Sequence, residues 1–81
     1  MELANAGNVI IPAIKVIRSL GFSLRLDKQS GLFKAEKDGN SFRAEDPVAV
    51  LGLIKIHEIK GADWRVSDKE LAAIGKEFDL L

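Results

Sequence analysis

The dipeptide His57-Glu58 resembles one half of a zinc-protease motif. The full pattern on such a helix is His-Glu-x-x-His, because two histidines one turn apart are needed to hold the metal. Position 61 is a glycine instead, and the chain has one histidine and no cysteine. We therefore interpret His57 as a partly buried helix residue. We expect no catalytic residue, no cofactor, no metal site and no enzyme activity.

Three basic residues, Arg25, Lys34 and Arg43, are expected to lie side by side across three strands, on the face of the sheet turned away from its apolar side. Like charges directly opposite one another destabilise a sheet, so such a row needs an explanation. An anionic partner such as RNA is one explanation, and it makes these residues a candidate anion-binding site. The alternative is that acidic side chains in neighbouring rows neutralise the basic ones: Asp27, Glu36 and Glu45.

Trp64 is the single tryptophan; it lies in a loop between two expected helices and is followed by Arg65. Large aromatic residues on loops are frequent anchors of protein interfaces, which makes Trp64 and Arg65 a candidate partner-binding site. Arg65 could stack on the indole or bind a phosphate. The alternative is structural, since a tryptophan at such a place can cap the end of a small core. The sequence leaves both interpretations open.

The composition indicates one small globular domain over residues 1–81. Apolar residues make up 47% of the chain and charged residues 30%, a balance too hydrophobic for disorder. The 12 basic and 12 acidic residues cancel, which argues against a domain that holds nucleic acid by bulk charge. Apolar runs are short and no export signal is recognisable, so we expect no membrane partner. A chain without cysteine is typical of a reducing compartment, and we expect a cytoplasmic protein.

The elements that must position these residues begin with an amphipathic helix. Apolar residues recur at helical spacing over residues 9–20, Pro12 suits the first turn of a helix, and Gly21 suits its end. Residues 1–8 are expected to form a flexible N-terminus.

Alternating apolar and polar residues after this helix predict three strands. Asp38-Gly39 favours a two-residue hairpin turn, because both positions of such a turn need positive φ. A register centred on this turn keeps the apolar residues on one face, and the same criterion fixes the first hairpin. The expected pairs are Ala35 with Phe42, Phe33 with Ala44, Leu26 with Phe33, and Leu24 with Ala35.

Two further helices are expected after the sheet. Asp46-Pro47 is an N-cap followed by a proline at the first helical position, and Gly61 is a suitable end. This helix is apolar on nearly all sides, so it is expected to be the most buried one. Ser67 and Glu70 have the spacing of a capping box, which predicts a third helix. Its expected apolar stripe contains Leu71, Ile74, Gly75, Phe78 and Leu81.

These elements follow the order α-β-β-β-α-α. We therefore expect an α+β fold, a single small domain in which helices cover one face of a three-stranded antiparallel meander. Residues 10–45 contain a helix that ends in Leu20-Gly21-Phe22, a first strand with Arg25, a turn at Gly31 and a hairpin at Asp38-Gly39. With this pattern the segment resembles double-stranded-RNA-binding domains, and its opening part is similar to HicA-type messenger-RNA-cleaving toxins. The resemblance implies contact with RNA, but Leu32 follows Gly31 where the toxins have a catalytic histidine, so no functional residue is carried over.

We expect a small, non-enzymatic binding or regulatory domain that acts through protein–protein contacts. Its second helix is apolar on more sides than one three-stranded sheet can cover. Either the first and third helices enclose that helix, or part of it forms the interface of a homodimer. The alternative function is an RNA- or anion-binding domain that uses the basic row.

Overall fold

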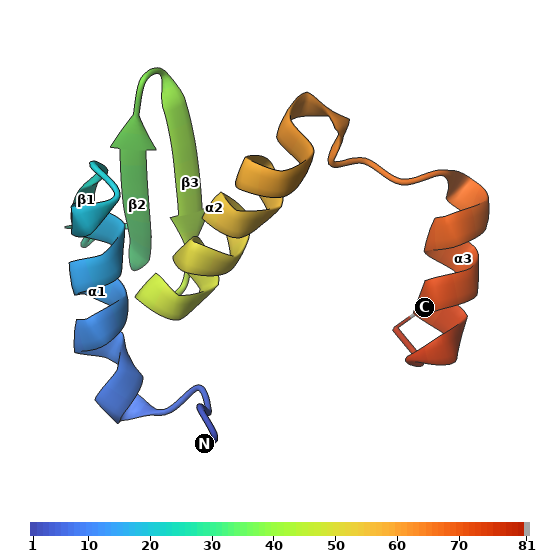
Figure 1. Cartoon of the computed structure of the whole chain (residues 1–81), viewed down its shortest axis with the longest axis horizontal. Helices are drawn as coiled ribbons and strands as arrows, with labels where there is room; N and C mark the ends of the chain where they lie inside the picture. The colour runs from blue at the N-terminus through green and yellow to red at the C-terminus, as the bar shows by residue number, and fades with distance from the viewer. Residues whose placement is uncertain (81) are drawn as a thin grey trace.

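The computed structural model describes residues 1–80 and confirms the expected α+β fold, a small single domain with three α-helices and one three-stranded antiparallel sheet (Figure 1). Leu81, which was expected to end both the domain and the stripe of the last helix, lies outside the described residues. The helices are α1 (Ile10–Ser19), α2 (Pro47–Lys60) and α3 (Asp68–Glu77), and the strands are β1 (Ser23–Asp27), β2 (Leu32–Lys37) and β3 (Asn40–Ala44).

Helix α1 begins and ends where the sequence indicates. A single 3₁₀ turn, Gly7–Val9, leads into it, so part of the expected flexible N-terminus has regular structure. Pro12 lies in the first turn, where its missing N–H has no intrahelical acceptor to lose. Gly21 ends the helix with φ of +91°, a backbone conformation that glycine adopts without steric cost.

The sheet has the predicted register. Asp38 and Gly39 both have positive φ, 51° and 80°, as a type I′ turn requires. The strand order is β1-β2-β3, with each strand antiparallel to its neighbour. All the expected pairs are observed: Ala35 with Phe42, Phe33 with Ala44, Leu26 with Phe33, and Leu24 with Ala35.

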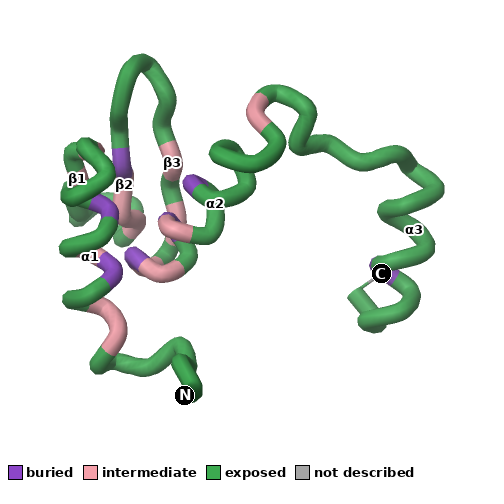
Figure 2. Tube along the Cα trace, in the orientation of Figure 1, coloured by how far each residue is buried: buried purple, intermediate pink, exposed green. Residues whose placement is uncertain are grey.

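Helices α1 and α2 cover one face of the sheet, and the core lies between these two layers (Figure 2). Its fully or nearly buried side chains come from α1, β2 and α2: Ile17, Ala35, Val50 and Ile54. Helix α2 starts as expected, because an Asp46 carboxylate oxygen accepts a 2.8 Å hydrogen bond from the Ala49 amide. Gly61, with φ of +57°, ends it.

Burial of α2 is less complete than the sequence suggested. Only one side of this helix faces the sheet and α1, so its C-terminal half exposes Leu53, Ile56 and Ile59. His57, which we interpreted as partly buried, is exposed as well. The reason is that a short sheet and one neighbouring helix cannot enclose a helix that is apolar on all sides.

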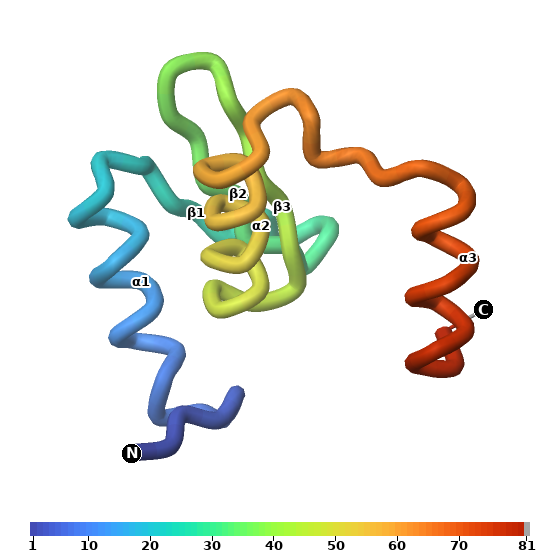
Figure 3. Tube along the Cα trace, turned by 45° about the vertical axis from the view of Figure 1, so that its right-hand side comes forward, coloured from blue at the N-terminus to red at the C-terminus, as the bar shows by residue number. Residues whose placement is uncertain are grey.

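Helix α3 stands apart from the rest of the molecule in both views (Figures 1 and 3). Within residues 1–80, α3 has at most marginal contact with any other element. The Cα radius of gyration is therefore 14.6 Å, whereas a compact chain of this length would have about 12 Å. The sequence left two arrangements of α2 open. In the described structure, α1 and α3 do not together enclose this helix.

Candidate functional site

A groove of about 350 Å³ lies between α2 and β3 at the point where the chain leaves α2. Strand β3 is an edge strand of the sheet, so residues from both of its faces reach the groove. We call it the Trp64 groove, and its principal lining residues are Phe42, Arg43, Leu53, Ile56, His57 and Trp64. It is largely apolar, as are surfaces that bind the apolar side of a partner helix.

Trp64 and Arg65 interact with each other at the end of this groove. The Arg65 guanidinium carbon lies 4.5 Å from the centre of the indole ring, in a cation–π arrangement. Trp64 itself is 53% exposed. A tryptophan that capped the core would be covered more completely, so the exposed indole favours the interpretation of Trp64 as an interface residue.

The exposed side of α2 extends the apolar surface beyond the groove. Leu53 and Ile56 belong to the groove, and Ile59, which is 67% exposed, follows one turn later. Gly52 lies beside them in the middle of the helix, and a Cβ atom added there would meet no described atom within 4 Å. A glycine inside a helix costs about 0.5–1 kcal/mol relative to alanine, and no contact within residues 1–80 requires it.

We call residues 66–80 the α3 arm. Its helix is stabilised locally by the predicted capping box: the Glu70 amide donates to Ser67 Oγ at 3.1 Å, and the Ser67 amide donates to Glu70 Oε1 at 3.3 Å. The apolar stripe of the arm is turned to solvent, with Leu71 54%, Ile74 52% and Phe78 65% exposed. The sequence predicted this stripe and left open whether it would cover α2, because an amphipathic pattern does not reveal what its apolar side contacts.

The basic row is present as predicted. Arg25 pairs with Lys34 and Lys34 with Arg43 across the three strands. Glu36 lies 3.7 Å from Arg25 and 3.6 Å from Lys34, so one carboxylate interacts with two members of the row. Arg43 forms no ion pair with any residue of the described chain. It lines the Trp64 groove instead, so the structure brings one of the candidate anion-binding residues to Trp64, whereas Arg25 lies on the opposite edge strand.

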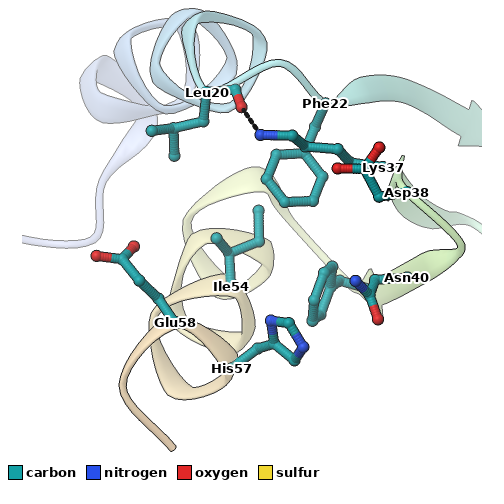
Figure 4. Close-up of a pocket in the computed structure, with 9 residues that line it drawn as sticks. Leu20, Phe22, Lys37, Asp38, Asn40, Ile54, His57 and Glu58 are labelled. Atoms are coloured by element: carbon teal, nitrogen blue, oxygen red, sulfur yellow. Dashed lines mark hydrogen bonds between the residues drawn. The ribbon is translucent and has the colours of Figure 1, made fainter. Parts of the chain in front are cut away.

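A second, smaller pocket of about 260 Å³ lies between the end of α1, the Asp38-Gly39 hairpin and α2 (Figure 4). Lys37 and Leu20 both line this pocket, and the Lys37 ammonium group donates a 2.7 Å hydrogen bond to the Leu20 carbonyl oxygen (Figure 4). This interaction was not foreseen from the sequence, since nothing in the local pattern relates positions 20 and 37. The charged residues that line the pocket are Lys37, Asp38 and Glu58, two acids and one base, so the pocket has no basic surface for an anionic ligand.

Asp27 is a titratable residue whose pKa is shifted by its surroundings. Its carboxylate accepts a 3.0 Å hydrogen bond from the Gln29 amide in the turn after β1. That bond, helped by Ser30, lowers the pKa of Asp27 below its ordinary value. The arrangement stabilises a turn. Within residues 1–80, no three His, Asp or Glu side chains gather at a metal-binding distance. Nor is any helix in that range long and apolar enough to cross a bilayer.

No protein-family profile matches this chain, and no curated protein or solved structure is significantly similar to it. The resemblance to RNA-binding and RNA-cleaving families therefore gains no support. The candidate site that the geometry supports consists of two exposed apolar surfaces. One is the Trp64 groove together with the outer side of α2, and the other is the apolar stripe of the α3 arm.

Proposed function

We propose that this protein is a non-enzymatic binding or regulatory domain that acts through protein–protein contacts. Its binding elements are the α3 arm and the Trp64 groove. The proposal places it in the cytoplasm, on the ground that a chain without cysteine needs no oxidising compartment.

The observation that carries this proposal is the area of exposed surface. The chain exposes 6598 Å², whereas a compact folded monomer of 81 residues exposes about 4,800 Å². The excess of roughly 1,800 Å² is larger than the 800 Å² that each partner of a standard protein complex buries. Large apolar side chains are exposed on both α2 and α3, among them Ile56, Ile59, Ile74 and Phe78, and contiguous exposed apolar patches mark interaction sites.

Photo-crosslinking tests the proposal in the cells that produce the protein. A benzophenone amino acid replaces Ile74 on the apolar stripe of the arm, and Lys69 on the opposite side of the same helix serves as the matched control. We expect protein adducts from position 74 and few or none from position 69. No adduct at position 74, or equal adducts at both, would contradict the proposal.

A second candidate function, binding of RNA or another anionic polymer, is supported by one observation. Arg25, Lys34 and Arg43 do lie in adjacent positions across the sheet, and Arg43 has no acidic partner in the described chain. Glu36 weakens the case, because its carboxylate lies close to both other basic residues and offsets part of their charge. Protein binding therefore stands first.

A further inference from the structure

We infer that the partner is a second copy of this chain, and that the α3 arm of each copy docks on the outer side of α2 and the Trp64 groove of the other. This inference rests on the proposed function and names its partner. Because each copy would both give an arm and receive one, the complex would be a two-fold symmetric dimer formed by arm exchange.

The shapes of the two surfaces correspond. A helix that docks in a groove uses anchors at positions i, i+3 and i+7, and the arm presents Leu71, Ile74 and Phe78 at that spacing. The ten residues of α3 span about 15 Å, enough to follow α2 over the two turns between Leu53 and Ile59. Gly52 gives this inference an independent argument, since a close helix–helix approach accounts for a mid-helix glycine that has no role within the described chain.

The charges beside the two apolar surfaces are opposite. On a helix, the positions that border the stripe of the arm on one side are Glu70 and Glu77, and both side chains are exposed. The basic residues Lys69 and Lys76 lie on the far side of the same helix. The surface that would receive the arm is bordered by the basic residues Arg43, Lys60 and Arg65, and by Lys55, whose ammonium group lies 3.2 Å from Glu58 Oε1.

The segment that leads into α3 favours docking of the arm on a second copy over docking on its own chain. Residues 64–67 are not helical, and four extended residues reach about 13 Å. Arg65 is held on the Trp64 ring, and Ser67 is held extended, with ψ of 158°, by the capping box. Docking of α3 on the same α2 would require the chain to reverse within this short connection. The observed connection instead carries α3 away from the body (Figure 3).

The area also favours reciprocal exchange. One arm on one groove would leave the second arm and the second groove exposed to solvent. Two-fold exchange covers both surfaces of both chains, and it closes the assembly so that no further copies add. The roughly 1,800 Å² of excess surface on each chain is of the size that dimers without a stable monomer bury.

Disulfide trapping tests the inference on the purified 81-residue chain, which has no cysteine of its own. One preparation carries Ile56→Cys on α2, and a second carries Ile74→Cys on the arm. Both positions are exposed, so neither substitution threatens the core. When the two preparations are mixed and oxidised, we expect a covalent dimer with a disulfide between positions 56 and 74. Lys69→Cys replaces Ile74→Cys in the matched control and should give at least tenfold less of the corresponding product.

The double variant Ile56→Cys with Ile74→Cys in one chain distinguishes a partner's arm from the chain's own arm. We expect a dimer linked by two disulfides. A monomer with an internal disulfide at low protein concentration would overturn the inference, because it would place the arm on its own body. Sedimentation of the unmodified chain should give twice the mass of one chain at micromolar concentration, and a monomer up to millimolar concentration would overturn it too.

The outcomes separate this inference from the function on which it rests. If the purified chain stays monomeric and forms no disulfide between positions 56 and 74, while benzophenone at position 74 captures a different protein, the dimer is wrong and the proposed function stands. If position 74 captures nothing and the chain is monomeric, both are wrong. A self-adduct at position 74 together with the expected disulfide supports both.

Discussion

The ammonium group of Lys37, at the end of β2, donates a hydrogen bond of 2.7 Å to the backbone carbonyl oxygen of Leu20, at the end of α1. The same group lies 5.5 Å from the centre of the Phe22 ring. One side chain thus satisfies a carbonyl at the C-terminus of a helix, where no intrahelical N–H is available, and joins α1 to the sheet.

Replacement of Lys37 by methionine should lower the free energy of unfolding by about 1 kcal/mol, because the variant keeps the aliphatic contacts and loses the hydrogen bond and the cation–π contact. Lys28→Met, in the exposed turn of the other hairpin, is the control and should change stability little. Urea denaturation of both variants measures the difference. Equal midpoints for the two would mean that the Lys37 contact contributes nothing to stability.

Ser67→Ala should affect α3 without affecting the body of the protein. The loss of an N-cap costs about 1 kcal/mol, which corresponds to roughly fivefold faster amide exchange in the first turns of the helix. Because α3 barely contacts the core, the unfolding midpoint of the monomer should not move. Hydrogen exchange and denaturation measure the two effects, and Ser67→Asp, which retains an acceptor, should restore slow exchange. A large shift in the midpoint would show that α3 packs on the body in solution.

The lowered pKa of Asp27 predicts a dependence of stability on pH. Its carboxylate is favoured in the folded state by the Gln29 amide, so the folded pKa lies below the unfolded one. The resulting stabilisation is complete above the unfolded value of about 4 and is lost as the pH falls through the folded pKa. Wild type should therefore exceed Asp27→Asn in stability at neutral pH, and the difference should shrink below that value. Thermal unfolding at several pH values measures this, and a difference that grows on acidification would contradict it.

Exchange of charges between the arm and its proposed receiving surface should convert a homodimer into a heterodimer. The variant with Glu70→Lys and Glu77→Lys makes the arm basic, and the variant with Lys55→Glu and Lys60→Glu makes the surface acidic. Each variant alone should dimerise at least about tenfold more weakly than wild type, because like charges then meet at both contacts. The two variants mixed should dimerise with each other, since both contacts of the mixed pair are complementary. Sedimentation at low salt measures this, and weakening that persists in the mixture would place these residues outside the contact.

The alternative function makes its own prediction through Glu36. Glu36→Gln releases Arg25 and Lys34 from their shared carboxylate and should strengthen binding of RNA at low salt, if the basic row binds RNA. Three phosphate contacts would give a slope of about 2 to 3 in the logarithm of affinity against the logarithm of salt concentration. Replacement of Arg25, Lys34 and Arg43 by glutamine should abolish that binding, whereas replacement of Lys15, Arg18 and Lys28 should not. Absence of RNA binding by the Glu36→Gln variant would rule out this function.

The sequence by itself determined the local structure, because the interactions that decide it connect residues close together in the chain. Asp38-Gly39 fixed one hairpin turn, and with it the pairing of Ala35 with Phe42 and the basic row. Ser67 and Glu70 likewise defined the start of α3 through a capping box within one turn.

The tertiary structure decided what the apolar surfaces contact. The pattern of α3 predicts an apolar stripe but is the same whether that stripe faces a core, a partner or solvent, and the structure leaves Leu71, Ile74 and Phe78 exposed. His57 was expected to be partly buried and is exposed, although its ring lies edge-to-face against Phe42 of β3 with 5.4 Å between the ring centres. Arg43 and Trp64 line the same groove, and Lys37 donates a hydrogen bond to Leu20. Both relationships join segments distant in the chain, so no local pattern encodes them.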